Sequence, residues 1–181
     1  MNNDSYLNHH SGAIIKVFNL ARKIFFSFHY ERDSWRVKHI RNSQKLLASY
    51  EETQFLDVIS WDEVKRKGDN SIKGWIDDQL NDTICTVVLI GNQTYSRKWV
   101  RYEIIESWRR GNGVLGVFIN NIKDENGTVD KPGKNPFNPI HFTARYGENY
   151  YPKIYNWVHD HGKSNISKWI EGAIKDRRDP Y

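Results

Sequence analysis

The sequence predicts an α/β protein with a parallel sheet of about five strands and helices on both faces. Short apolar stretches alternate along the chain with segments in which apolar residues recur every three or four positions. Two of the apolar stretches, 84–90 (ICTVVLI) and 114–120 (VLGVFIN), hold few polar side chains, which is typical of strands covered on both faces. The 181 residues suffice for one such domain with its own core.

We expect an N-terminal extension before this domain. Residues 1–11 are polar and rich in Asn and His, and residues 12–22 have the spacing of a short amphipathic helix. The chain therefore divides into an extension over 1–22, partly disordered or forming a short helix, and one domain over 23–181.

The first half of the domain is predicted to hold two strand–helix pairs. Its strands are marked by β-branched and aromatic residues, and its helices by apolar residues three and four positions apart. Asp69 or Asn70 is expected to cap the second helix, because such side chains accept hydrogen bonds from free backbone N–H groups. The four elements are a strand at 23–28, a helix at 34–50, a strand at 54–60 and a helix at 71–81.

The second half continues the alternation and contains one long irregular stretch. Ser96 is expected to cap the helix that follows the strand at 84–90, and Gly111 to end it. Residues 120–152 show no clear element, and their aromatic residues indicate a lid or a subunit contact rather than disorder. The remaining elements are strands at 114–120 and near 153–158, and a helix near 165–176.

Composition is that of an ordinary globular protein and argues against several partners. The net charge of +5, from 27 basic and 22 acidic residues, is spread along the chain, so we expect no nucleic-acid partner. No stretch reaches the roughly 20 apolar residues of a membrane span. Residues 12–23 also lack the cleavage site of a signal peptide. We therefore expect a cytoplasmic protein with no membrane partner.

Disulfide and metal chemistry are not expected. Cys85 is the one cysteine, so an internal disulfide is impossible, and its apolar neighbours predict a buried, inert thiol. The histidines show no metal-ligand spacing, because His159 and His161 in the segment HDH would face apart on a helix. The sequence therefore predicts neither a metal nor a cofactor.

Familiar nucleotide and hydrolase motifs are absent or misplaced. The segment 111–116 (GNGVLG) has the letters of a dinucleotide fingerprint, but it precedes a strand instead of following one. The chain contains no Walker A sequence and no G-x-S-x-G nucleophile motif. A ligand site must therefore be built from other residues.

Aromatic, basic and acidic side chains follow the predicted strands, at the edge where parallel α/β sheets bind ligands. Aromatic faces suit stacking with a nicotinamide or adenine ring, and guanidinium groups suit a pyrophosphate. Each aromatic side chain has the alternative role of a core or interface residue. The candidates for substrate binding are Phe28, His29, Tyr30, Arg32, Arg36, Trp61, Asp62, Trp99, Arg101 and Tyr102.

Glu103 differs from these residues because its own helix offers it no cation. Its neighbours three and four positions away are Trp99, Val100, Glu106 and Ser107. On a helical wheel Glu103 lies at the border of the apolar face, so we expect a half-buried carboxyl near the sheet. A glutamate there needs either a partner from another element or a function.

The segments KIFFSFHYERDSWRVKHIRN, CTVVLIGNQTYSRKWVRYEI and GKNPFNP occur in this order within about residues 23–176. Together they resemble the TIR-like ThsB family of the bacterial Thoeris anti-phage system. The middle segment is the most specific, since a strand followed by IGNQT and then W-V-R-Y-E is not shared by α/β proteins in general. The resemblance implies a flavodoxin-like, TIR-like sheet for the domain over 23–181.

The resemblance also implies an enzyme with NAD⁺ as its substrate, cleaved between nicotinamide and ribose after phage infection. It implies release of a cyclic ADP-ribose isomer, or a related ADP-ribose conjugate, as a messenger that activates a separate effector protein. The glutamate of W-V-R-Y-E is catalytic in the family, and it falls on Glu103. TIR enzymes commonly build a working site between subunits, which implies self-association for activity.

One carboxylate suffices for this chemistry. Most glycosidases use a second carboxylic acid to protonate the leaving group, whereas nicotinamide is cationic while attached and leaves neutral. A single carboxylate near the ribose can stabilise the positive charge that develops there. The alternative interpretation of Glu103 is a salt bridge to Arg32 or Arg36. The alternative for the protein is a non-enzymatic TIR-like module that binds a nucleotide or a protein partner.

Overall fold

The computed structural model describes residues 22–43, 50–52, 63–144 and 147–178. They form a five-stranded parallel sheet with helices and a separate two-stranded antiparallel sheet. The predicted extension, apart from Arg22, and the predicted strand at 54–60 lie outside these ranges. None of the helices that the structure describes has both the length and the apolar character needed to cross a membrane.

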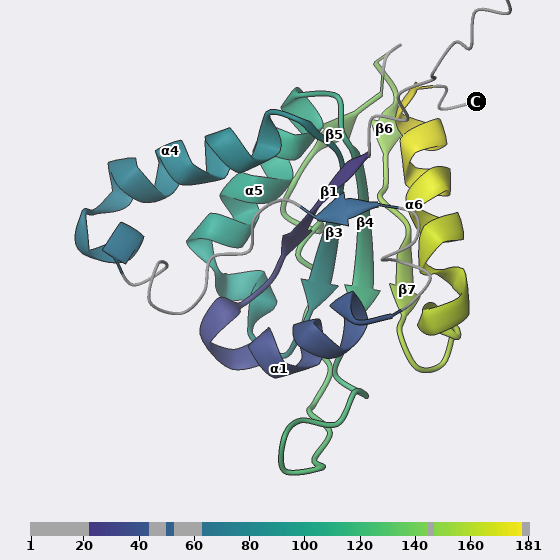
Figure 1. Ribbon diagram of the computed structural model, residues 1–181. Coiled ribbons are helices and arrows are strands. Elements are labelled where there is room, and N and C mark those ends of the chain that lie inside the picture. The colour runs from purple at the N-terminus through teal and green to yellow at the C-terminus, as the bar shows by residue number, and fades with distance from the viewer. Residues whose placement is uncertain (1–21, 44–49, 53–62, 145–146, 179–181) are drawn as a thin grey trace, which may run out of the picture.

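The main sheet has the strand order β2-β1-β3-β4-β7, and every pair is parallel. The chain adds β2 on one side of β1, then β3, β4 and β7 on the other side (Figure 1). This order is flavodoxin-like, and it confirms the predicted parallel sheet of about five strands. The strands are β1 (Lys23–Ser27), β2 (Glu51–Glu52), β3 (Thr83–Ile90), β4 (Gly113–Phe118) and β7 (Ile154–Asn156).

Helices cover both faces of the sheet, as predicted. One core cluster joins Ile24 and Phe26 of β1 to buried residues of α1 (Tyr30–Arg41) and α6 (Gly162–Arg178). On the other face, Phe25 of β1 packs with α4 (Asp69–Leu80), and β3 and β4 pack with α5 (Lys98–Arg109). Figure 1 shows α4 and α5 on the side of the sheet away from α6.

The register between β1 and β3 contains a bulge. Lys23 lies opposite Thr83, but Ile24 lies opposite Cys85, so β3 has one extra residue at this point. Beyond the bulge the pairing is regular up to Ser27 and Val88. Since side chains alternate along a strand, Phe25 and Ser27 share the face of α4 and α5.

α1 starts earlier than the sequence predicted, at Tyr30 instead of residue 34, and it ends at Arg41. Glu31 and Asp33 lie in its first turn, where negative charge favours the positive end of the helix dipole. The prediction relied on the spacing of apolar residues, and because the first turn is largely polar the start of the helix was missed. The later part of the predicted helix, 44–49, lies outside the described residues.

The predicted cap of α4 is wrong. The helix begins at Asp69, and the residue before it is Gly68, whose φ of 89° is in the region that favours glycine. Neither Asp69 nor Asn70 caps the helix, because no side chain makes a cap hydrogen bond there. The turn conformation of Gly68, rather than an acidic side chain, sets the start of α4.

The predicted cap of α5 is also wrong. Ser96 belongs to a short 3₁₀ turn, η1 (Thr94–Ser96), and its hydroxyl donates to the carbonyl of Gln93 at 3.0 Å. Arg97 takes the cap position, and α5 starts one residue later. Gly111, with φ of 81°, follows the end of the helix, as predicted.

The stretch 120–152 contains two short strands that the sequence did not predict. β5 (Phe142–Thr143) pairs antiparallel with β6 (Asn149–Tyr150), and strands of two residues are too short for a periodic pattern. Trp108 of α5 stacks on Tyr150 with ring centroids 4.8 Å apart, which fixes this small sheet against α5. β4 and β7 are shorter than predicted, and α6 is longer.

Candidate active site

The candidate site lies at the carboxyl ends of β1 and β3. The strand order reverses between these strands, so the chain leaves β1 toward α1 on one face and β3 toward α5 on the other. Open parallel sheets form a crevice at such a reversal, and ligands bind there. Side chains from the end of β1 meet side chains of α5 at this point.

Glu103 of α5 is buried more deeply than the half-buried position predicted from the sequence, with 7% of its surface exposed. Val100 and Ile104 pack onto the sheet and bring Glu103 against β1. Ser27, the last residue of β1, donates a hydrogen bond of 2.5 Å to Oε2 of Glu103. Burial raises the pKa of Glu103 to about 8, while the hydrogen bond from Ser27 acts to lower it.

Among the described residues no cation pairs with Glu103. Arg32 binds Asp130 at 2.6 Å, and Arg36 lies 3.5 Å from Asp33. The alternative salt bridge from Glu103 to either arginine is therefore not formed. A buried carboxyl without a counter-charge is costly, and such groups concentrate at functional sites.

The backbone of Glu103 is held by a chain of hydroxyl groups. Ser107, one turn later on α5, donates to the carbonyl of Glu103 at 2.6 Å. The hydroxyl of Thr86 on β3 lies 2.7 Å from that of Ser107, and both are buried. This chain links α5 to the central strand and fixes the position from which the Glu103 side chain extends.

His29 lies beside the same helix. It is buried just beyond β1 in an extended conformation, and its ring nitrogens contact the Nη2 of Arg97. Burial and the neighbouring Arg97 lower the pKa of His29, so the ring is neutral at pH 7. Arg97 also lies 3.7 Å from Glu31, a contact too long for a hydrogen bond.

Phe28, a candidate from the same segment, lies elsewhere. Phe28 packs against the core cluster shared with α1 and α6, so it lies on the opposite face from Ser27. The rings of Phe28 and Tyr30 have centroids 6.0 Å apart. The structure therefore brings His29, but not Phe28, to the face that Glu103 occupies.

The aromatic candidates of α5 pack against α4. Trp99 and Tyr102 meet edge to face at 5.9 Å and adjoin the cluster of Phe25 with buried residues of α4. The Tyr102 hydroxyl donates to Asp77 at 2.9 Å, and burial together with this bond raises the pKa of Tyr102 to about 12. Arg101 is exposed. These contacts join the two helices, and a role in substrate binding for these three residues stays a prediction.

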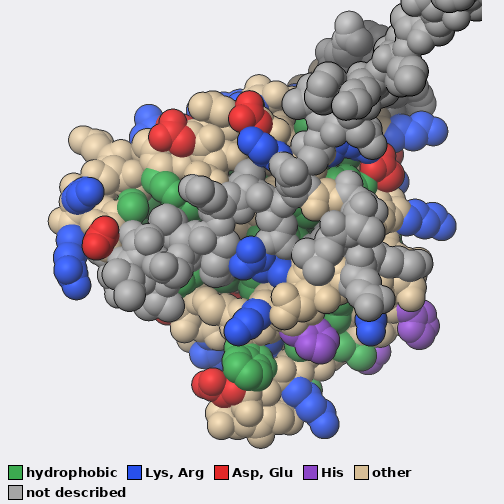
Figure 2. All heavy atoms as spheres, in the orientation of Figure 1, with side chains coloured by type: hydrophobic (Ala, Val, Ile, Leu, Met, Phe, Trp, Pro, Cys, Tyr) green, Lys and Arg blue, Asp and Glu red, His purple; other side chains and the backbone are tan. Residues whose placement is uncertain are grey.

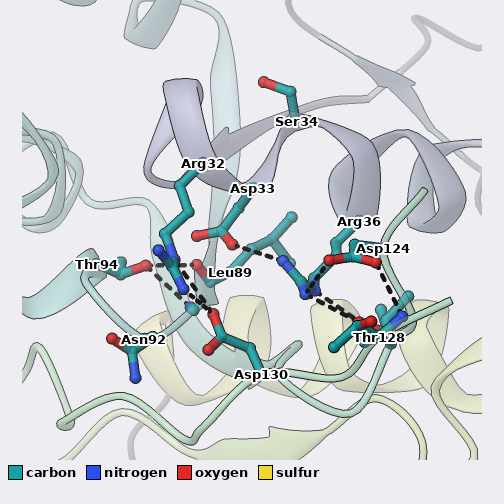
Figure 3. A network of polar contacts seen from close by, with 12 residues as sticks. Arg32, Asp33, Ser34, Arg36, Leu89, Asn92, Thr94, Asp124, Thr128 and Asp130 are labelled. Atoms are coloured by element: carbon teal, nitrogen blue, oxygen red, sulfur yellow. Dashed lines mark hydrogen bonds and ion pairs between the residues drawn. The ribbon is translucent and has the colours of Figure 1, made fainter. Parts of the chain in front are cut away.

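Arg36 fastens the segment after β4 to α1 (Figure 3). Its buried guanidinium donates to the carbonyls of Ile122 at 2.9 Å and Thr128 at 3.3 Å, and lies 3.7 Å from Asp124. Asp124 in turn accepts hydrogen bonds from backbone N–H groups, including that of Thr128. The contacts of Arg36 therefore hold this loop in place.

Asp33 and two glycines pack the loops together. A Cβ on Gly91 would lie 2.2 Å from Oδ2 of Asp33, and a Cβ on Gly133 would lie 2.0 Å from the carbonyl oxygen of Gly91. Burial raises the pKa of Asp33 to about 6, against the lowering effect of Arg36. The glycines of IGNQT and GKNPFNP thus serve close backbone packing at the end of β3.

Sequence reasoning missed two residues of the site, and two candidates fall outside the described ranges. Ser27 had a signal, as the one hydroxyl in the apolar run KIFFSF, and Arg97 is a cation at a helix start, where cations are disfavoured. Trp61 and Asp62 lie in the part of the chain that the structure does not describe.

On the face shown in Figure 2, Lys and Arg side chains are spread among other residue types.

Comparison with known proteins gives two findings. The family model described as Thoeris protein ThsB, TIR-like domain, matches residues 25–124, which include the end of β1 and all of β3, β4 and α5. A protein of Bacillus cereus (strain MSX-D12) with the name "Putative cyclic ADP-D-ribose synthase ThsB1" is 33% identical over 165 residues. The match covers 90% of this chain and 79% of that protein.

Proposed function

Because this chain belongs to the ThsB TIR-like family of the Thoeris system, we propose that it cleaves NAD⁺ between nicotinamide and ribose. Its product is a cyclic ADP-ribose isomer or a related ADP-ribose signal, which activates a separate effector protein. The name of the Bacillus cereus relative, a cyclic ADP-D-ribose synthase, supports this reaction class.

The observation that carries the proposal is the buried carboxyl of Glu103 at the strand reversal. It contacts Ser27 and has no counter-ion among the described residues. A structural glutamate in that position would be stabilised by a cation, whereas here the carboxyl has only the Ser27 hydroxyl as a partner and keeps its proton up to about pH 8. This is the environment expected of a group that acts on a positively charged substrate.

The reaction is derived from this environment. The carbon–nitrogen bond breaks, its electron pair passes to the nicotinamide nitrogen, and positive charge is left on the ribose. Ionised Glu103 stabilises that charge, and a buried site of low dielectric strengthens the attraction. An adenine nitrogen then attacks the ribose carbon and gives a cyclic product, or a water oxygen attacks it, loses a proton to solvent and gives a linear one. Because nicotinamide is cationic in bound NAD⁺, substrate binding also favours the ionised form of Glu103.

Glu103→Gln tests the proposal, and Glu106→Gln is its matched control. Glu106 lies on the same helix and pairs with Arg109 at 2.8 Å. Nicotinamide release from NAD⁺, measured by chromatography with and without phage-infected lysate, should fall by about 10²-fold or more for Glu103→Gln. It should be unchanged for Glu106→Gln. Equal turnover by wild type and Glu103→Gln would remove Glu103 from the reaction.

A second candidate is a TIR-like module that binds a nucleotide or a protein without reaction. The hydrogen bond from Ser27 and the raised pKa of Glu103 favour it, since a neutral, hydrogen-bonded carboxyl is stable without catalysis. Mass spectrometry of the same incubations separates the two functions. New ADP-ribose products support the enzyme, and their absence with bound NAD⁺ intact supports the module.

We propose that the chain acts inside the cell and must associate with further copies of itself to be active. The resemblance to TIR enzymes implies a site that is completed by packing subunits together, and residues 120–144, which follow β4, offer a surface for such contacts. Specific activity should then rise with protein concentration, in parallel with the mass measured by light scattering. Constant specific activity from a monomer would contradict this part of the proposal.

A further inference from the structure

Two alternate residues of one extended segment face α5. Ser27 ends β1 and contacts Glu103, and His29, which is also extended, contacts Arg97. Alternate residues of an extended chain lie about 7 Å apart on the same side. Glu103 and Arg97 therefore contact alternate residues on the same side of this segment.

In the described part of the chain Arg97 makes one long ion pair, to Glu31, and Glu31 is shared with a closer cation. The Arg97 side chain is 41% exposed, and its one carboxylate neighbour, Glu31, lies 3.7 Å away and is held by Lys65 at 2.8 Å. The Nε of Arg97 is buried without a hydrogen-bond partner among these residues. The guanidinium thus keeps donor groups that an incoming anion can use.

The position of Arg97 also works against the stability of the helix. It occupies the N-terminal cap of α5, and the first turn of this helix contains no acidic residue. A cation at that end is opposed by the helix dipole, whose positive end lies there. The guanidinium and the dipole therefore both attract an anion at this position. Lys98, the next residue, pairs with Asp69 and so does not share this role. A strongly positive position beside a catalytic carboxyl suits an anionic part of the substrate.

We infer that Arg97, together with His29, binds the diphosphate of the dinucleotide while Glu103 faces the ribose carbon that loses nicotinamide. The inference rests on the proposed function. Only a few covalent bonds separate that carbon from the nearer phosphate, which matches the spacing of the two contacts on the β1 segment. The neutral His29 ring leaves Arg97 to supply the charge, and the planar guanidinium can bind phosphate oxygens in pairs.

Binding by the full chain tests the inference without requiring turnover. Titration calorimetry compares ADP-ribose with adenosine, which lacks phosphate, for wild type, Arg97→Gln and the control Arg109→Gln. Arg109 is an exposed arginine of the same helix that pairs with Glu106. We expect Arg97→Gln to weaken ADP-ribose binding about tenfold. Adenosine binding should not change, and Arg109→Gln should behave as wild type.

Kinetics separate this inference from the proposed function. Arg97→Gln should raise KM for NAD⁺ more than it lowers kcat, and Arg97→Lys should restore part of the loss. Glu103→Gln should retain ADP-ribose binding even though it releases no nicotinamide. If ADP-ribose binds equally to wild type and Arg97→Gln, or does not bind wild type at all, the diphosphate assignment is overturned. If Glu103→Gln turns over normally while Arg97→Gln loses ADP-ribose binding, the proposed catalytic role fails and the binding inference stands.

Discussion

Glu103 is the residue at which burial and charge conflict most directly. Its carboxyl has lost most of its water, and one hydroxyl, that of Ser27, replaces it. The folded protein therefore holds a proton on Glu103 up to about pH 8, whereas the unfolded chain releases it near 4.5. This difference makes the stability of the protein depend on pH.

Glu103→Gln should be more stable than wild type at high pH, even though its turnover of NAD⁺ should fall. The folded state binds more protons than the unfolded state between pH 4.5 and about 8, so the stabilisation by neutral Glu103 is complete below that window. It is lost as the pH rises through the window, by up to about 1.4 kcal/mol per pH unit. Urea unfolding at several pH values should show the free-energy advantage of Glu103→Gln widening with pH. A constant difference between the two proteins would contradict the buried proton.

Ser27→Ala should move the pH dependence of the reaction. The hydroxyl of Ser27 lowers the pKa of Glu103, so its removal should raise that pKa further. The reaction needs the ionised form, so kcat/KM should fall near neutral pH and recover on the alkaline side. The measurement is the pH profile of NAD⁺ turnover, with Ser34→Ala on α1 as the control. Superimposable profiles of wild type and Ser27→Ala would show that Ser27 does not set the proton affinity of Glu103.

Sequence reasoning reached Glu103 at this scale but could not see its surroundings. The absence of a cation on its own helix was visible in the spacing of residues, because helix neighbours follow from the sequence. Ser27 lies 76 residues away, and its contact exists only once β1 packs beneath α5. The same limit applied to Arg32 and Arg36, whose partners lie on the distant loop after β4.

At the scale of elements, the connections after β3 and β4 depend on backbones that approach closely. Gly91 touches the carboxyl of Asp33 on one side and approaches Gly133 on the other. No side chain fits between these groups without displacing α1 or the loop. The lid or subunit contact predicted for 120–152 must therefore use a stretch whose early part is already attached to α1 by Arg36.

Gly91→Ala should destabilise the fold, and Gly74→Ala should not. The added Cβ at Gly91 meets the Asp33 carboxyl, and such overpacking costs about 1–3 kcal/mol. Gly74 lies in the exposed interior of α4 with nothing within 4 Å of a Cβ, so alanine there should stabilise. The expected gain is about 0.5–1 kcal/mol, because glycine is a poor helix former. Thermal unfolding of both variants measures the effects, and equal midpoints would refute the close packing at Gly91.

Helix boundaries show why prediction was weaker for elements than for the fold. The polar start of α1 offers no apolar period to detect, and both predicted caps were placed on side chains that make no cap. The strands were easier because a buried apolar run is visible directly in the sequence, as at β3 and β4. Propensity and spacing locate an element, whereas tertiary contacts decide its ends.

On the scale of the whole molecule, alternation was enough to predict the architecture. Consecutive strands joined by helices must form a parallel sheet with right-handed crossovers, and this leaves few possible orders. The observed order places the reversal between β1 and β3, where Ser27 and Glu103 meet. The general location of the site therefore followed from topology, although the contacts within it did not.

Cys85 should report global unfolding. It is fully buried in β3 between β1 and β4, and burial raises the pKa of its thiol. As the chain has one cysteine, labelling by a thiol reagent measures a single position. The free energy derived from labelling should equal that from denaturant unfolding, and ADP-ribose should slow the labelling by stabilising the folded state. Equally fast labelling with and without denaturant would mean that the sheet opens locally.

The bulge in β3, opposite Lys23 and Ile24, sets the register in which β1 pairs with β3. Odd-numbered positions bring Ser27 and His29 to α5, while even-numbered positions send Phe26 and Phe28 into the opposite core. A register shift of one residue would leave a strand with the same apolar residues but would turn its two faces over. Glu103 and Arg97 would then face Phe26 and Phe28 instead of Ser27 and His29. The contacts of Glu103 and Arg97 with the β1 segment thus depend on the register that β1 adopts from its first residues onward.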